Sequence, residues 1–264
     1  MLRKTMTFLV AFMLCTTPLV GPAAAADDIG VVLLHGKWGT AKPKSPIGKL
    51  AARLKRAGFA VQLPSVAWSK SRYLDRDYEA AMADIDQAVK TLKAAGKTKI
   101  VVGGQSMGAN AALGYGARHD GLAGVMAIAP GHIPEVRGYQ DRLDHDYKRA
   151  LAAVGAGNGD QVDGYKDLNQ GKAKNVRVKA HIYASWFDID GPASMPKNAA
   201  ALKSGTPLLW MVGTRDSMLE RGEDYAFSGA PPHANNAYVV IDGASHGNTP
   251  IKGADAVIDW LNGL

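Results

Sequence analysis

Residues 99–112 constrain the fold more than any other part of the chain. Their β-branched residues lead into two glycines, and a serine and a run of small residues follow. This order predicts a strand, a sharp turn and a helix. Residues 104–108, Gly-Gln-Ser-Met-Gly, match the G-x-S-x-G pattern, in which the serine hydroxyl is exposed on a tight strand-to-helix turn. The segment predicts Ser106 as a nucleophile, and the alternative is a glycine-rich turn that only packs.

Strand-like and helix-like segments alternate along the rest of the chain. Apolar runs are typical of buried strands, and helical patterns with one apolar face separate them. Parallel strands joined by right-handed crossovers form an open sheet with helices on both faces, so we expect an α/β fold with a mostly parallel sheet of about six strands. Besides the strand before Ser106 and the helix after it, strands are expected at 29–34, 59–63, 124–129, 207–212 and 237–241, and helices at 46–58, 75–95, 195–203 and 253–264.

Residues 131–191 interrupt this alternation. They are polar, with a charged helical pattern near 142–154, a glycine-rich joint at 155–159 and a strand-like run at 176–184. An insertion at this place would overhang the carboxyl ends of the strands, where ligands bind in open parallel sheets. We therefore expect a cap or lid within a single domain that spans residues 27–264.

Three candidate catalytic side chains each follow a separate expected strand. Ser106, Asp216 and His246 come in that order along the chain, and their strands would end at one edge of the sheet. A serine hydroxyl becomes a strong nucleophile when a histidine takes its proton, and a carboxylate orients that histidine and stabilises its charged form. The three positions predict a catalytic triad. Taken singly, Asp216 could be a turn residue and His246 a surface histidine.

The first expected strand ends at residues 35–39, His-Gly-Lys-Trp-Gly. A glycine-containing loop at this place often supplies one amide of an oxyanion hole, and the residue after the nucleophile supplies the other. We expect the amides of Lys37 and Met107 to face the substrate oxygen, with Trp38 as the second choice for the loop amide. Trp38 and Trp68 are also candidates for an apolar wall of the substrate pocket, although core packing would explain either one.

Four motifs together resemble those of the α/β-hydrolase superfamily. They are His-Gly at 35–36, the segment 104–108, Gly-Thr-Arg-Asp at 213–216 and Gly-Ala-Ser-His-Gly at 243–247. The resemblance covers essentially all of residues 27–264. It implies an α/β-hydrolase fold with a cap-like insertion.

The resemblance also implies a role for each candidate residue. The chain departs from the family in two places: Asp28 runs directly into the first core strand, where the family often has two antiparallel strands, and the oxyanion loop lacks the glycine triplet of the hormone-sensitive-lipase-like esterases. The implied roles are nucleophile for Ser106, acid for Asp216, base for His246, and oxyanion donors for the amides of Met107 and Lys37.

Together these features predict a serine hydrolase that cleaves a carboxylic ester through an acyl-enzyme intermediate. This chemistry needs no metal and no organic cofactor, and the expected partner is a small-molecule ester. The same triad would serve a peptidase, an amidase or an acyltransferase, and a non-catalytic binding protein could use the same scaffold. The sequence indicates neither the substrate nor the oligomeric state.

Residues 1–26 have the features of a secretory signal peptide. Two basic residues precede an apolar run, and alanines at 23–26 offer a cleavage site before Asp27. A membrane anchor and a lipoprotein lipidated at Cys15 are the alternatives, but the apolar run is short for a span and no small residue precedes Cys15. We therefore expect a protein exported to the periplasm or secreted, with no stable membrane insertion after cleavage.

Charge and cysteine content narrow the range of partners. Cys15 is the only cysteine, so the exported protein would hold no disulfide and no thiolate nucleophile. Loss of residues 1–26 removes two positive charges, Arg3 and Lys4, and lowers the formal net charge from +7 to +5. The remaining basic residues are scattered and no nucleic-acid-binding motif is present, so a nucleic acid is not an expected partner. No histidine spacing indicates a metal site.

Overall fold

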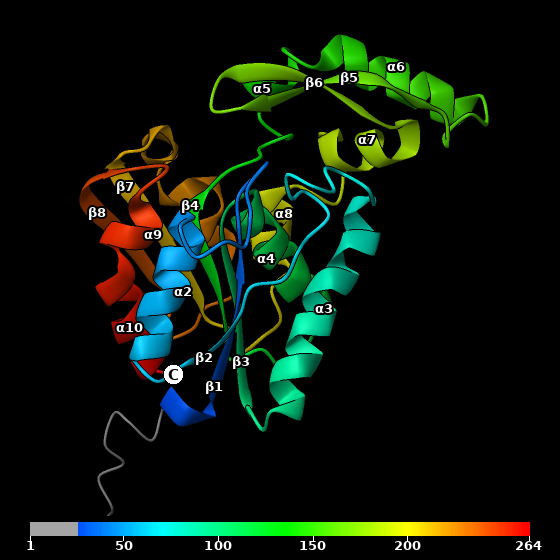
Figure 1. The fold of residues 1–264 in the computed structure, drawn as a ribbon. Helices are drawn as coiled ribbons and strands as arrows, with labels where there is room; N and C mark the ends of the chain where they lie inside the picture. Colours follow the sequence, from blue (N-terminus) through cyan, green and yellow to red (C-terminus); the bar gives the residue numbers. More distant parts are fainter. Residues whose placement is uncertain (1–25) are drawn as a thin grey trace, which may run out of the picture.

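The computed structural model describes residues 26–264, which form a central parallel sheet between layers of helices (Figure 1). The strand order is β2-β1-β3-β4-β7-β8, and every pair of neighbours is parallel. This confirms the predicted α/β fold with a six-stranded sheet. The strands are β1 (Ile29–Leu34), β2 (Ala60–Gln62), β3 (Lys99–Ser106), β4 (Gly124–Pro130), β7 (Leu208–Arg215) and β8 (Ala237–Ser245).

Helices cover both faces of the sheet (Figure 1). One face packs against α2 (Pro46–Arg56) and α10 (Ala254–Asn262), and the other packs against α3 (Tyr78–Ala94), α4 (Met107–Arg118) and α8 (Met195–Ala200). Short elements complete this part of the chain: α9 (Thr249–Lys252) and the 3₁₀ helices η1 (Ser217–Arg221), η2 (Glu223–Tyr225) and η3 (Phe227–Gly229).

β1 shows why a continuous apolar run becomes a central strand. Ile29, Val31 and Leu33 point into the core beside α2 and α10, while Val32 and Leu34 point into the core beside α3 and α4. All five side chains are completely buried. A strand between two helical layers has no wet face, so its sequence needs apolar residues at consecutive positions.

Helix starts follow capping residues in the sequence. The Ser45 hydroxyl accepts a hydrogen bond from the Gly48 amide at 3.1 Å, and Pro46 takes the first helical position of α2. The Asp77 carboxylate accepts from the Ala80 amide at 2.7 Å. The helix predicted from residue 75 therefore begins only at Tyr78, after this cap.

Five elements between β4 and α8 lie over the carboxyl ends of the sheet strands (Figure 1). We refer to residues 131–191 as the cap. Its hairpin pairs two antiparallel strands, with Asn169 opposite Lys172 next to the turn. The cap elements are α5 (Arg137–Gln140), α6 (Asp144–Gly155), β5 (Val162–Asn169), β6 (Lys172–Lys179) and α7 (Ala180–Phe187).

The strand predicted at 176–184 is wrong for its second half. β6 ends at Lys179 and α7 begins at Ala180. A short apolar run does not show by periodicity alone whether it is strand or buried helix, and here it is both in turn. The partner strand β5 was not predicted, because its alternation of polar and apolar residues is interrupted by Gly164 and by the buried Asp167.

Asn110 ties both ends of the cap to α4. This completely buried side chain lies on α4, one turn after Ser106. Its amide nitrogen donates to the carbonyl oxygen of His132 at 2.8 Å and to that of Ala193 at 2.6 Å. The Tyr78 hydroxyl donates to its side-chain oxygen at 3.0 Å. The segment that enters the cap and the segment that leaves it are therefore held by the same buried side chain.

The predicted signal peptide covers residues 1–26, and all of it except Ala26 lies outside the described residues, so its cleavage before Asp27 stays a prediction. Within 26–264, none of the helices combines the length and the apolar character needed to cross a bilayer.

Candidate active site

Ser106 stands on a strained turn between β3 and α4. Its φ is 57° and its ψ is −121°, a backbone conformation that is rare for a residue with a side chain. Two glycines let the turn close. A Cβ on Gly104 would lie 2.5 Å from the carbonyl carbon of Gly108, and a Cβ on Gly108 would lie 2.5 Å from the carbonyl oxygen of Leu34. The predicted strand, turn and helix are all present.

We expect Gly108→Ala to lower the free energy of unfolding by about 1–3 kcal/mol, because its methyl group would meet the backbone of β1. Urea unfolding of the purified variant measures this loss. Gly155→Ala is the matched control, since a Cβ there would meet no heavy atom within 4 Å. Equal stabilities of the two variants would contradict the close approach of α4 to β1.

Asp216 and His246 form a hydrogen-bonded pair at the ends of β7 and β8. The carboxylate Oδ2 lies 2.9 Å from Nδ1 of the imidazole. The other oxygen, Oδ1, accepts from the Met218 amide at 3.1 Å and caps η1. Both carboxylate oxygens are therefore held, and the side chain is 3% exposed. Such a carboxylate fixes the proton on Nδ1 and leaves Nε2 free to accept another.

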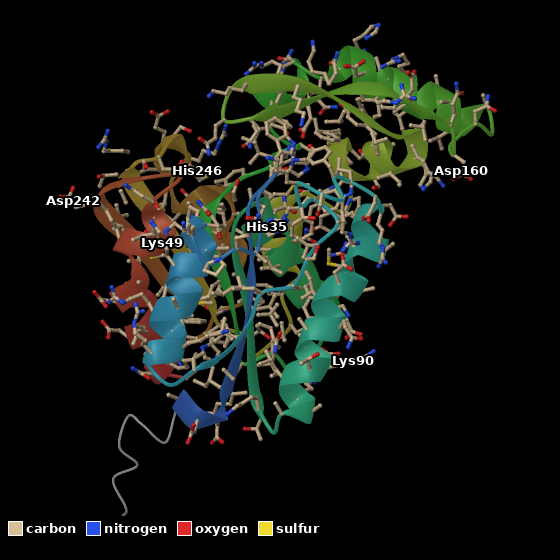
Figure 2. The ribbon with its side chains drawn as sticks, in the orientation of Figure 1. His35, Lys49, Lys90, Asp160, Asp242 and His246 are labelled. Carbon is tan, nitrogen blue, oxygen red and sulfur yellow. The ribbon has the colours of Figure 1, made fainter. Side chains whose placement is uncertain are left out.

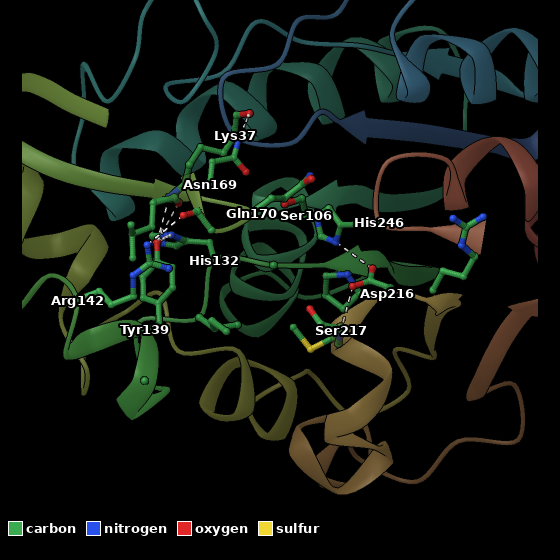
Figure 3. Close-up of a pocket in the computed structure, with 18 residues that line it drawn as sticks. Lys37, Ser106, His132, Tyr139, Arg142, Asn169, Gln170, Asp216, Ser217 and His246 are labelled. Atoms are coloured by element: carbon green, nitrogen blue, oxygen red, sulfur yellow. Dashed lines mark hydrogen bonds and ion pairs between the residues drawn. The ribbon is translucent and has the colours of Figure 1, made fainter. Parts of the chain in front are cut away.

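The serine and the histidine meet at Gly131, directly after β4. A Cβ on this glycine would lie 2.8 Å from Ser106 Oγ and 3.3 Å from Cε1 of His246. Figure 3 shows His246 beside Ser106, with Asp216 behind the ring. The structure thus brings together the three residues singled out from the sequence. Gly131 was missed, because one glycine after a strand carries no pattern of its own.

The loop after β1 adjoins the serine, as expected for an oxyanion loop. A Cβ on Gly36 would lie 3.1 Å from the Cβ of Ser106. Lys37 lines the same cavity as Ser106, and Met107 begins α4. The side chain of Lys37 leaves this loop and enters the cap, where the Asp167 carboxylate lies 2.5 Å from its Nζ.

The two tryptophans expected to line the pocket do not line it. Trp68 is completely buried, and its indole N–H donates to the carbonyl oxygen of His35 at 2.7 Å. Trp38 packs against Tyr73, with ring centroids 6.0 Å apart, and Lys174 Nζ lies 5.2 Å from the centroid of the Trp38 ring. Trp68 therefore supports the loop after β1 from the core side, and Trp38, which belongs to that loop, is covered by Tyr73 and by Lys174 of the cap.

Two cavities open onto Ser106 and His246. The larger, of about 520 Å³, lies between the cap and the loop after β7. The smaller, of about 180 Å³, lies between the loop after β1 and the start of α2. Asn169 and Gln170, at the tip of the cap hairpin, border both cavities. The other residues named in Figure 3 that line the larger cavity are Lys37, His132, Tyr139, Arg142, Asp216 and Ser217.

The ionisable groups around the serine do not assemble a metal site. In the part of the chain that the structure describes, no three side chains of His, Cys, Asp or Glu are grouped to hold an ion. Burial, followed by the nearby charge of Lys37, holds the pKa of His132 well below its usual value, so this ring is neutral at pH 7. His132 is fixed by Trp186, whose carbonyl oxygen lies 2.7 Å from Nε2.

Solved structures share this architecture at low sequence identity. Paleococcus ferrophilus monoacylglycerol lipase is 22% identical with a TM-score of 0.62, over 89% of this chain and 94% of that one. Est1E from Butyrivibrio proteoclasticus with bound ferulic acid is 15% identical with a TM-score of 0.56, over 94% and 91%. DcsB in complex with its substrate analogue is 13% identical with a TM-score of 0.67, over 90% and 91%. These likenesses show a common fold.

Sequence comparison gives the family directly. A search of curated proteins found no match. The family model described as serine aminopeptidase, S33, matches residues 28–249, which include all four motifs and the whole cap. The chain belongs to the serine aminopeptidase S33 family of α/β-hydrolases.

Proposed function

We propose that this protein is a serine hydrolase that cleaves a carboxylic ester through an acyl-enzyme intermediate. Ser106 attacks the carbonyl carbon, His246 takes the serine proton and later gives it to the leaving alcohol, and Asp216 orients the imidazole. The observation that carries the proposal is the arrangement around Gly131, where the hydroxyl and the paired imidazole contact one point at the cavity floor.

The oxyanion of the tetrahedral intermediate needs donors that are already in place. We assign this role to the amides of Met107, at the start of α4, and Lys37, in the loop after β1. Met107 adds the positive end of the helix dipole to its N–H. The contact between Gly36 and Ser106 supports the assignment, because it brings the loop within reach of the attacked carbonyl.

The charges of the larger cavity favour an ester over the peptides cleaved by an aminopeptidase, the activity in the family's description. A peptide N-terminus is a cation and needs a carboxylate. Among described residues, the only acid that lines this cavity is Asp216, which is engaged with His246, while Arg142 and Arg215 also line it. Several similar structures carry lipase or esterase in their names, which agrees with this choice.

The test compares an ester with an amide on one purified protein. We expect hydrolysis of p-nitrophenyl butyrate and covalent labelling by a fluorophosphonate, with little release of p-nitroaniline from an aminoacyl anilide. Faster cleavage of the anilide would favour the aminopeptidase. Labelling without turnover of either substrate would favour an acyltransferase, and absence of labelling would favour a binding protein.

The two cavities predict an ester in which one of the two parts, acyl or alcohol, is large and the other is small. We call these two parts the arms of the ester. A volume of about 520 Å³ lies within the roughly 300–1,000 Å³ of common ligand sites, whereas about 180 Å³ is close to the roughly 150 Å³ that admits a benzene molecule. Varying the acyl and alcohol chains separately should show one arm that tolerates lengthening and one that does not.

Two phenylalanine substitutions should change this preference in opposite directions. Gly138→Phe fills the larger cavity, at a position where a Cβ meets no heavy atom within 4 Å, and Thr40→Phe fills the smaller one. We expect each to lower kcat/KM about 10-fold for esters with a longer chain on the filled side. Equal losses on both ester series would contradict the assignment of arms to cavities.

A further inference from the structure

The side chain of Lys37 joins the oxyanion loop to the cap. It is 3% exposed, although a lysine normally keeps its ammonium in water. The ammonium donates to Asp167 Oδ1 at 2.5 Å, to the carbonyl oxygen of Leu168 at 3.0 Å and to the Tyr139 hydroxyl at 3.1 Å. An ammonium has three donors, so all of them are used.

All of these partners belong to the cap, and they come from more than one of its elements. Asp167 and Leu168 lie on β5, and Tyr139 lies on α5. The ring of Phe187, the last residue of α7, has its centroid 5.2 Å from Nζ. Three cap elements therefore contact one cation, which comes from the loop after β1.

Asp167 is arranged to receive this cation. Its carboxylate is completely buried, and Oδ1 also accepts from the Leu168 amide at 2.7 Å. Burial opposes the charged form of Lys37, but Asp167 and Tyr139 together outweigh it and raise the pKa of the ammonium. Because the desolvation of a buried ion pair can exceed its attraction, such a pair is weak evidence for a role in stability. The directed hydrogen bonds of this pair instead fix the position of the loop after β1 relative to the cap.

The ion pair lies next to both halves of the site. Asn169 and Gln170, which border the two cavities, follow Asp167 by two and three residues. The Asn169 amide also lies 3.5 Å from the carbonyl oxygen of Lys37. The hairpin tip thus contacts the loop after β1 at Lys37 itself.

We propose that Lys37 is a positioning residue whose side chain couples docking of the cap to the placement of its own backbone amide in the oxyanion hole. The inference rests on the proposed ester hydrolysis. A substrate that displaces the hairpin would loosen the oxyanion loop, and the enzyme would reach its full rate only with the cap in place.

Three variants test the coupling: Lys37→Met, Asp167→Leu and the double variant. Each single variant leaves one buried charge unpaired and should lower Tm. The double variant exchanges the pair for apolar side chains and should regain Tm, but apolar contacts have no direction and do not fix the loop. We expect its kcat for p-nitrophenyl acetate to stay about 10-fold or more below that of the parent, with KM changed less than about 3-fold, since one oxyanion donor is worth about 10²–10³ in kcat.

Lys179→Met is the matched control. Lys179 also pairs with an aspartate of the cap, Asp160 at 2.8 Å, but this pair is exposed at the outer end of the cap, where Figure 2 labels Asp160. Exposed pairs contribute little, so Tm and kcat should match those of the parent.

The rate of fluorophosphonate labelling separates failure of this inference from failure of the proposed function. Labelling also needs the oxyanion hole, so it should slow in parallel with kcat in the double variant. A double variant with the parental kcat and labelling rate would overturn the coupling and leave the ester hydrolase intact. A parent that neither hydrolyses the ester nor reacts with the probe would overturn the proposed function itself.

Discussion

Replacement of Ser106 by alanine is expected to lower kcat/KM for a p-nitrophenyl ester by about 10⁴-fold or more and to abolish fluorophosphonate labelling. Without the hydroxyl no acyl-enzyme forms, and the oxyanion donors can assist only direct attack by water. The fold should be retained, because Ser106 makes no side-chain hydrogen bond to its helix and alanine removes one atom. Alanine at a positive φ adds some strain, so Tm should be measured beside the rate.

Ser204→Ala is the control for this experiment. Ser204 is an exposed serine between α8 and β7, remote from the strand ends that carry Ser106, Asp216 and His246. It should keep the parental rate and labelling. Ester hydrolysis that survives in Ser106→Ala at more than a few per cent of the parental rate would remove Ser106 from its proposed role, whatever happens at the control position.

Asp216→Asn is expected to lower kcat by about 10⁴-fold while the fold is retained. An amide can keep the cap of η1, because its oxygen can still accept from Met218. Its NH₂ group would then donate to Nδ1 of His246, where the carboxylate Oδ2 now accepts. The imidazole proton would move to Nε2, and the ring could no longer take the proton of Ser106.

Asp242→Asn makes the same chemical change on the neighbouring strand. Asp242 lies on β8, is exposed, and makes only a 3.4 Å contact with the Thr214 hydroxyl (Figure 2). Steady-state kinetics of the two variants should therefore differ by about four orders of magnitude in kcat. Similar rates would assign the orienting role to another acid or to none.

Most of the fold could be predicted because each core element carries its own pattern. β1 needs apolar residues at consecutive positions, and α2 and α3 begin at capping residues that precede their apolar faces. The cap was harder. Its hairpin contains Gly164 and a buried aspartate, and the apolar run at 176–184 changes from strand to helix at Ala180. In a segment this polar, packing against the rest of the fold decides which secondary structure forms, and the periodicity of the sequence does not show what each face packs against.

The sequence by itself determined the order in which strands and helices follow one another along the chain, the turn that carries Ser106, and the strand ends that carry Asp216 and His246. These follow from local spacing, because a strand, a glycine turn and a capped helix each fix their own backbone. Only the tertiary structure decided that Ser106 and His246 meet at Gly131, that Trp68 supports the loop after β1 from the core, and that Lys37 reaches into the cap to meet Asp167. Those contacts join residues as many as 130 positions apart, and their side chains acquire a role only when packing excludes water between them.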